Sequence, residues 1–120
     1  MSRILSVDDS VSMRQMIEFT LTSAGFDVTS AVDGEDGLLK ASEGSFDLII
    51  SDVNMPRMDG IQMIKALRSQ KNYQFTPILM LTTESGGDKK QEGKDAGATG
   101  WIIKPFDPDK LLNVIKKVLN

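Results

Sequence analysis

The sequence predicts an α/β domain built on a doubly wound, five-stranded parallel β-sheet with five helices. Short apolar runs alternate five times with longer segments in which apolar residues recur at helical spacing. One run, Leu48-Ile49-Ile50, is apolar without a break, as expected of a strand with helices on both faces of its sheet. The chain has 120 residues, 40% of them hydrophobic and 26% charged, which suits one domain with a buried core. Residues 1–120 are therefore expected to form a single domain.

Three strands and two helices are expected in the first half of the chain. The strands are predicted at residues 3–7, 27–31 and 46–51. Ser10 is expected to cap the first helix and Gly25 to end it. The apolar positions that predict this helix are Met13, Met16, Ile17, Leu21 and Ala24. Asp33-Gly34 forms a turn into a short second helix around Leu38, Leu39 and Ala41.

In the second half, a turn is predicted at residues 55–60. Pro56 prevents a helix or a strand ladder from continuing, and Gly60 is free to adopt a positive φ. Ile61, Ile64 and Leu67 then indicate a third helix. Two more strands are predicted at residues 78–82 and 99–104, and the apolar stripe of the last helix is Leu111, Val114, Ile115 and Val118. Residues 85–97 contain three glycines before the last position and one apolar side chain, so we expect only a marginal helix there.

Composition excludes several classes of function. The net charge of −3 argues against nucleic-acid binding, which depends on Lys and Arg contacts to phosphate groups. The absence of cysteine and histidine excludes disulfides, thiolate chemistry, serine–histidine hydrolases and histidine-ligated zinc. Acidic residues follow the N-terminus too early for a signal peptide, and no apolar run approaches the ~18 residues of a membrane span. A cytoplasmic protein with no membrane or nucleic-acid partner is expected.

Polar residues end most of the predicted strands. Asp8 and Asp9 follow the first strand, Asp52 the third, Thr82 the fourth and Lys104 the fifth. The carboxyl ends of parallel strands meet at one rim, where such folds bind ligands. Two carboxylates about 4 Å apart repel by roughly 4 kcal/mol at an effective dielectric constant near 20, so this cluster needs a cation. Oxygen-only ligands favour Mg²⁺, and the set is typical of phosphoryl transfer with a carboxylate as acceptor.

Each of these residues also has a purely structural explanation. Asp8-Asp9 could serve as helix capping, Thr82 as an ordinary strand residue and Lys104 as a solvated charge. Independent structural causes do not predict three acids, a hydroxyl and a lysine at matching strand ends, and this coincidence favours a functional site.

Five motifs in order and spacing carry a family resemblance that spans the chain. They are Val7-Asp8-Asp9-Ser10, Ser51-Asp52-Val53-Asn54-Met55-Pro56, Met58-Asp59-Gly60, Leu81-Thr82-Thr83-Glu84 and Lys104-Pro105-Phe106. With these motifs the sequence resembles the receiver domains of two-component response regulators, and most closely the single-domain, CheY-like chemotaxis regulators. The resemblance implies a flavodoxin-like strand order of 2-1-3-4-5.

The resemblance also implies roles for the rim residues. Asp52 would be the phosphorylated residue, and Mg²⁺ would be bound by Asp9, Asp52 and the backbone carbonyl of Asn54, with Asp8 assisting through water. Lys104 would pair with the phosphoryl group, and Thr82 would move to hydrogen-bond one of its oxygens.

Further positions follow from the same likeness. Asn54 and Glu84 would tune hydrolysis of the phosphoryl group, and Lys104-Pro105 is a candidate cis peptide. Trp101 stands where the family carries a Tyr or Phe whose rotamer is coupled to phosphorylation. It could equally be a half-buried cover of an edge strand, and both interpretations stay open.

Partners are implied in the same way. A histidine kinase, expected to be of the chemotaxis type, or a small acyl phosphate would donate the phosphoryl group, and the domain would catalyse its own phosphorylation and dephosphorylation rather than act as an ordinary enzyme. A monomer would then signal to a protein such as a flagellar motor switch component, or meet a phosphatase. The predicted fourth helix carries Lys89, Lys90, Gln91 and Glu92 instead of apolar residues, so a phosphate sink or relay without motor binding is the alternative. A small Mg²⁺-dependent phosphatase and a flavin carrier are the weaker readings from other classes.

Overall fold

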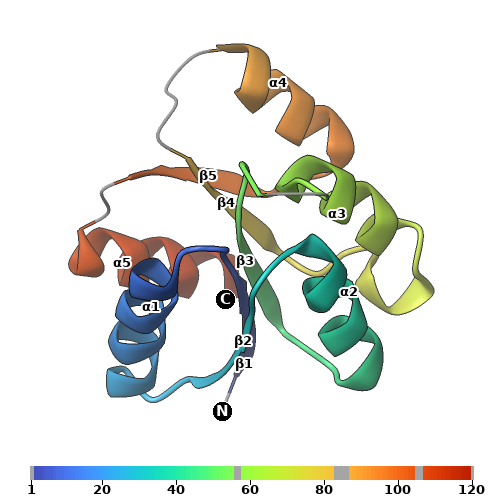
Figure 1. Cartoon of the computed structure of the whole chain (residues 1–120). Helices are drawn as coiled ribbons and strands as arrows, with labels where there is room; N and C mark the ends of the chain where they lie inside the picture. Colours follow the sequence, from blue (N-terminus) through green and yellow to red (C-terminus); the bar gives the residue numbers. More distant parts are fainter. Residues whose placement is uncertain (1, 56–57, 83–86, 105–106, 120) are drawn as a thin grey trace.

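The computed structural model describes residues 2–55, 58–82, 87–104 and 107–119, with the backbone alone for residues 87–90. Five strands and five α-helices alternate along the chain (Figure 1). In chain order they are β1 (Arg3–Val7), α1 (Val11–Ser23), β2 (Asp27–Ala31), α2 (Gly34–Glu43), β3 (Leu48–Asp52), α3 (Gly60–Arg68), β4 (Ile78–Thr82), α4 (Gly87–Ala96), β5 (Gly100–Ile103) and α5 (Pro108–Leu119). A short 3₁₀ turn, η1 (Lys71–Tyr73), precedes β4.

The strands form one parallel sheet in the order β2-β1-β3-β4-β5, which confirms the predicted fold class and strand order (Figure 1). β3 lies in the middle, and all five of its residues are buried. One core packs α1 and α5 against the sheet through Ile17, Leu21, Leu111 and Ile115. The other core lies on the opposite face and contains residues of α2, α3 and α4. Helices on both faces explain why β3 and β4 are apolar throughout most of their length.

Most predicted boundaries agree with the structure, and two strands are shorter than expected. β3 begins at Leu48 rather than at residue 46, because Asp47 binds the start of β1 instead of joining the ladder. Its N–H donates to the Arg3 carbonyl at 2.8 Å, and its carboxylate accepts from the Arg3 N–H at 2.8 Å. β5 covers only Gly100–Ile103. Just before it, the Ile78 N–H donates to the Thr99 hydroxyl at 3.0 Å rather than to a main-chain carbonyl of β5.

Gly60 does not adopt the positive φ that the sequence left open to it. Gly60 is the first residue of α3, and the positive-φ glycines of the described chain are Gly25 and Gly97. Its N–H donates to the Val53 carbonyl at 2.8 Å, and a Cβ on Gly60 would overlap the Asp52 carbonyl and lie 2.7 Å from Met80 Cε. Glycine is needed here for close approach of α3 to the end of β3, which fixes the main chain next to Asp52.

The glycine-rich fourth segment forms the ten-residue helix α4. Among its described side chains, only Gly93 and Ala96 are buried. No helix among the described residues has the length and apolar character needed to cross a membrane.

Candidate functional site

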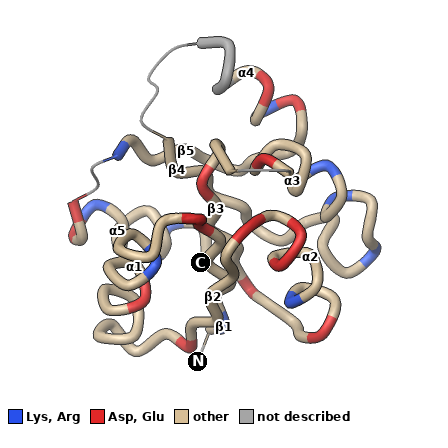
Figure 2. The backbone as a smooth tube through the Cα atoms, viewed as in Figure 1, with Lys and Arg blue, Asp and Glu red and all other residues tan. Residues whose placement is uncertain are grey.

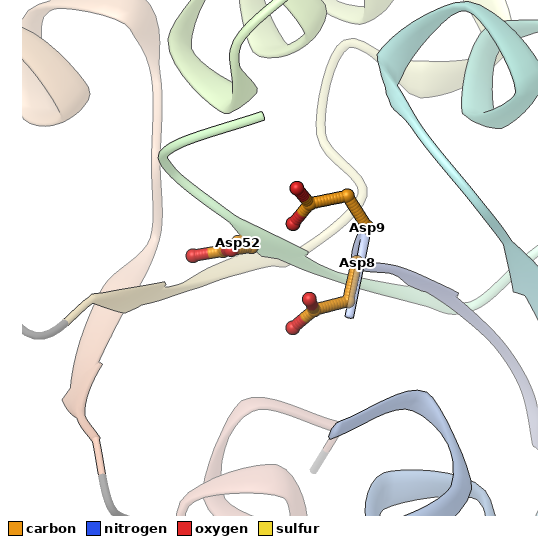
Figure 3. Close-up of side chains that lie close together, drawn as sticks. All are labelled: Asp8, Asp9 and Asp52. Carbon is orange, nitrogen blue, oxygen red and sulfur yellow. The ribbon is translucent and has the colours of Figure 1, made fainter. Parts of the chain in front are cut away.

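Three carboxylates gather at the adjoining carboxyl ends of β1 and β3 (Figure 3). Asp8, Asp9 and Asp52 each offer an oxygen, and these oxygens all lie within 4.8 Å of one another. Asp8 is fully buried, Asp52 is 7% exposed, and Asp9 is exposed to solvent. The sheet topology therefore brings together the three acids that the sequence placed at one rim.

Lys104 brings a positive charge to this cluster from the residue after β5. Its Nζ lies 3.2 Å from Asp52 Oδ1 and 3.4 Å from Asp8 Oδ2, and its side chain is only 13% exposed. Its backbone N–H donates to the Thr82 carbonyl at 2.8 Å, which joins the ends of β4 and β5. Three carboxylates and one ammonium leave a formal charge of −2. That remainder matches a divalent cation, and the donors are oxygens of the kind Mg²⁺ prefers.

Asp8 is held in place by several contacts. Its Oδ1 accepts from the Ser10 N–H at 2.9 Å, its Oδ2 pairs with Lys104, and its own N–H donates to the Ala31 carbonyl at 3.1 Å. A buried carboxylate is tolerated because such partners replace its water. Asp9, the next residue, is exposed and is therefore better placed to bind an ion directly.

Burial raises the pKa of the Asp52 carboxyl above its ordinary value of 3.8. Repulsion by Asp8 acts in the same direction, while Lys104 opposes both through its charge and its hydrogen bond. The ionised Asp52 is therefore destabilised in the folded, cation-free protein, and a bound cation would relieve the repulsion.

The remaining predicted residues divide between described and undescribed parts of the chain. Thr82 is buried at the end of β4, and Asn54 is exposed two residues beyond Asp52. Thr82 and Lys104 thus reach the rim with the acids. Glu84 and the Lys104-Pro105 peptide, together with Pro56, involve positions outside the described residues.

Trp101 lies half-buried in β5 and packs against Gly93 of α4. A Cβ added to Gly93 would overlap the indole, lying 3.0 Å from its Cη2 and 3.2 Å from its Cε2. The sequence showed Gly93 only as a residue that weakens a helix. In the structure, Gly93 leaves the space that the indole occupies. The sequence feature that could have indicated this contact is the tryptophan eight residues after the glycine.

The raised pKa of Asp52 gives a prediction about stability. The folded protein holds the Asp52 proton more tightly than the unfolded chain, so the stabilisation by this proton is present below pH 3.8 and is lost as the pH rises through the folded pKa. Asp52→Asn, which is permanently neutral, should therefore stabilise the metal-free protein at pH 7 by about 1 kcal/mol. This advantage should shrink as the pH falls toward 3.8. Urea unfolding in EDTA measures it.

The matched control is Asp95→Asn, which neutralises an exposed aspartate and keeps an acceptor for Gln91. It should change stability by less than about 0.5 kcal/mol. An Asp52→Asn protein no more stable than wild type at pH 7 in EDTA would show that repulsion and burial do not dominate at this site.

The packing of Trp101 gives a second prediction. Helix propensity alone predicts that Gly93→Ala stabilises the protein by about 1 kcal/mol. Because the added methyl group overlaps the indole, we expect instead no gain in stability and a red shift of Trp101 emission as the ring moves into solvent. Gln91→Ala, on the exposed side of α4, should leave the emission unchanged. In a Trp101→Phe background, the smaller ring should allow Gly93→Ala to stabilise the protein. If Gly93→Ala alone raises stability and leaves Trp101 emission unchanged, the packing argument is refuted.

Comparison with known proteins agrees with this geometry. The model of the response regulator receiver domain family matches residues 4–116. The chemotaxis protein CheY4 of Vibrio cholerae is 56% identical, with a TM-score of 0.96 and 98% of both chains covered. The response regulator ArlR of Staphylococcus aureus is 38% identical over 119 residues, which are 99% of this chain and 53% of ArlR. The chain thus spans about half the length of the curated relatives it matches.

A more distant structure shares the fold. The receiver domain of the sensor histidine kinase PA1611 from Pseudomonas aeruginosa is 28% identical, with a TM-score of 0.92 and coverage of 98% of this chain and 97% of that one. Its structure has a magnesium ion coordinated in the active site cleft. With a family match over most of its length, the sheet order of the family and three acids at the ends of β1 and β3, the chain belongs to the receiver domains of two-component response regulators.

Proposed function

We propose that this chain is a phosphorylation-activated switch that accepts a phosphoryl group on Asp52 from a phosphohistidine of a histidine kinase. The observation that carries the proposal is the grouping of Asp8, Asp9 and Asp52 within 4.8 Å, with Lys104 touching two of them. Such a site supplies a phosphoryl acceptor, carboxylates that can bind a metal ion, and a positive charge. Phosphoryl transfer needs little else, because positioning and charge stabilisation provide most of the catalysis.

Each residue has a separate task in the proposed reaction. A carboxylate oxygen of Asp52 attacks phosphorus, a P–O bond forms, and the P–N bond to the donor imidazole breaks. Lys104 Nζ, now 3.2 Å from Asp52 Oδ1, follows the charge onto the phosphoryl oxygens. Asp9, Asp52 and the Asn54 carbonyl would hold Mg²⁺, with Asp8 assisting through water. When bound, the ion neutralises the oxygens of the transferred group.

Phosphorylation changes the charge at the end of β3 by about −1, because a carboxylate of charge −1 becomes an acyl phosphate of charge near −2. Thr82 lies at the end of the neighbouring strand and would donate a hydrogen bond to a phosphoryl oxygen. The Lys104 N–H binds the Thr82 carbonyl, so a movement of either residue shifts the other. Trp101 lies in the strand that precedes Lys104, and its rotamer would report the change.

A chemotaxis role is supported by the 56% identity to CheY4 of V. cholerae, which is described as a chemotaxis protein. A chemotaxis-type kinase would then be the donor, and a flagellar motor switch protein or a phosphatase would bind the domain, which we expect to be monomeric. A phosphate sink or relay is the alternative, favoured by the exposed polar residues Gln91 and Glu92 on α4. Binding of the beryllofluoride-activated chain to a motor switch peptide separates the two functions.

The acceptor role of Asp52 is tested by intact mass after incubation with acetyl phosphate and Mg²⁺. Wild type should gain one alkali-labile phosphoryl group, whereas Asp52→Asn should gain none because its amide is not a nucleophile. Asp95→Asn, which keeps the site intact, should label like wild type. Normal labelling of Asp52→Asn would falsify the assignment, and turnover of acetyl phosphate without an adduct would indicate a small phosphatase.

The cation site gives a further prediction. An ion that binds only the folded protein stabilises it by mass action, by about 2.7 kcal/mol at a hundredfold excess over the Kd. We expect Asp9→Asn to lose most of this gain, because Asp9 is the exposed member of the acid cluster and is free to bind an ion directly. Urea unfolding of both proteins in EDTA and in Mg²⁺ measures the difference. Equal gains in the two proteins would exclude Asp9 as a ligand.

A further inference from the structure

Arg14 makes a contact at the edge of the acid cluster that the sequence did not suggest. It is the fourth residue of α1, and its side chain points back toward the end of β1. Its Nη1 donates a hydrogen bond to the backbone carbonyl of Asp8 at 2.7 Å, and the side chain is half-buried. A short hydrogen bond with a charged donor is among the stronger contacts available in a protein.

The contact fixes the one peptide group that joins two of the three acids. β1 ends at Val7, and the Asp8 N–H still binds the Ala31 carbonyl of the neighbouring strand. The Asp8 carbonyl then accepts from Arg14. Arg14 therefore holds the carbonyl oxygen of the peptide group that joins Asp8, which is buried, to Asp9, which is exposed. A rotation of this peptide would carry the Asp9 carboxylate away from Asp52.

Other hydrogen bonds close the same segment into a ring. The Ser10 N–H binds Asp8 Oδ1 at 2.9 Å, and the Ser10 hydroxyl accepts from the Met13 N–H at 3.3 Å. The backbone N–H of Arg14 donates to the Ser10 carbonyl at 3.0 Å. Arg14 is thus bound at its main chain to Ser10 and at its side chain to Asp8. A ligand group held in this way loses little freedom when an ion binds, and its affinity for the ion is higher for that reason.

From these contacts we infer that Arg14 is a positioning residue for the divalent cation site, acting through the Asp8–Asp9 peptide and not touching the ion. The inference rests on the proposed function, since it concerns the cation that the proposed reaction requires. No motif of the family resemblance includes Arg14, and among the described residues its guanidinium donates to the Asp8 carbonyl.

The charge of Arg14 makes the inference testable by the sign of an effect. A guanidinium beside the acids repels Mg²⁺, so if Arg14 acted only as a charge, its removal would strengthen Mg²⁺ binding. If Arg14 acts by fixing the Asp8–Asp9 peptide, its removal weakens Mg²⁺ binding although a repulsive charge has gone. The two roles predict changes in opposite directions.

The experiment is a Mg²⁺ titration of the full chain followed by backbone amide chemical shifts. Arg14→Met keeps an apolar stem and removes the donor, and we expect its Kd for Mg²⁺ to rise about tenfold, the scale seen when residues supporting a metal ligand are changed. Arg14→Lys keeps a charge and a donor and should recover most of the affinity. Arg3→Met removes the same charge at the opposite end of β1, where Arg3 contacts Asp27 and Phe46, and should leave the Kd within about twofold.

The outcomes separate this inference from the proposed function. Asp9→Asn serves as the control with weakened Mg²⁺ binding. If the wild-type chain binds Mg²⁺ no better than this control, the proposed cation site itself is overturned. A wild type that binds, with an Arg14→Met variant that binds equally or more tightly, overturns only the positioning role. Urea unfolding in EDTA shows whether each variant is folded under the titration conditions. If Arg14→Met is not folded, Arg14→Leu, which is uncharged and has no hydrogen-bond donor, replaces it with the same expected weakening.

Discussion

The repulsion among Asp8, Asp9 and Asp52 is the constraint on which the rest of the site depends. Carboxylate oxygens within 4.8 Å of one another destabilise the folded state unless a positive charge lies among them, and Lys104 supplies the charge described here. Figure 2 shows acidic residues at the ends of β1 and β3 and a basic residue at the end of β5. The site is therefore held ready for a cation or a phosphoryl group, at a cost that the two cores on either side of the sheet must offset.

The scaffold holds Asp52 by hydrogen bonds to the main chain around it rather than by side-chain packing alone. The Val53 N–H donates to the Leu81 carbonyl at 3.1 Å, the Gly60 N–H donates to the Val53 carbonyl, and the Ser51 hydroxyl donates to the Asp52 carbonyl at 2.9 Å. These bonds fix the direction in which Asp52 leaves β3. Since the position of Asp52 is set by the central strand, its more adjustable partner is Lys104, which follows the edge strand β5.

Sequence reasoning reached the strand ends because parallel topology alone brings them to one rim. It could not show which partner each polar group selects. Lys104 could have remained in solvent, and only the closeness of β5 to β3 across β4 directs it to Asp8 and Asp52. Gly60 was expected to turn the chain through its φ, whereas it is required because α3 approaches the Asp52 carbonyl too closely for a Cβ. Such close approaches depend on how elements pack and leave no periodic signal in a sequence.

In the proposed switch, Lys104 connects the chemistry to the surface because it has two kinds of contact. Its side chain binds the acids, and its main chain binds Thr82 at the end of β4. Trp101 lies three residues before Lys104, in the edge strand β5, with its indole against Gly93 of α4. Movement of the indole therefore requires no displacement of a side chain at position 93. Because Gly93 and Ala96 are the only buried residues among the described side chains of α4, little packing opposes a shift of this helix. A ligand or modification can shift an equilibrium between two states only by its differential interaction with them. In this switch, a change of one charge at Asp52 needs to supply only the small free-energy difference between two arrangements of Trp101 and α4.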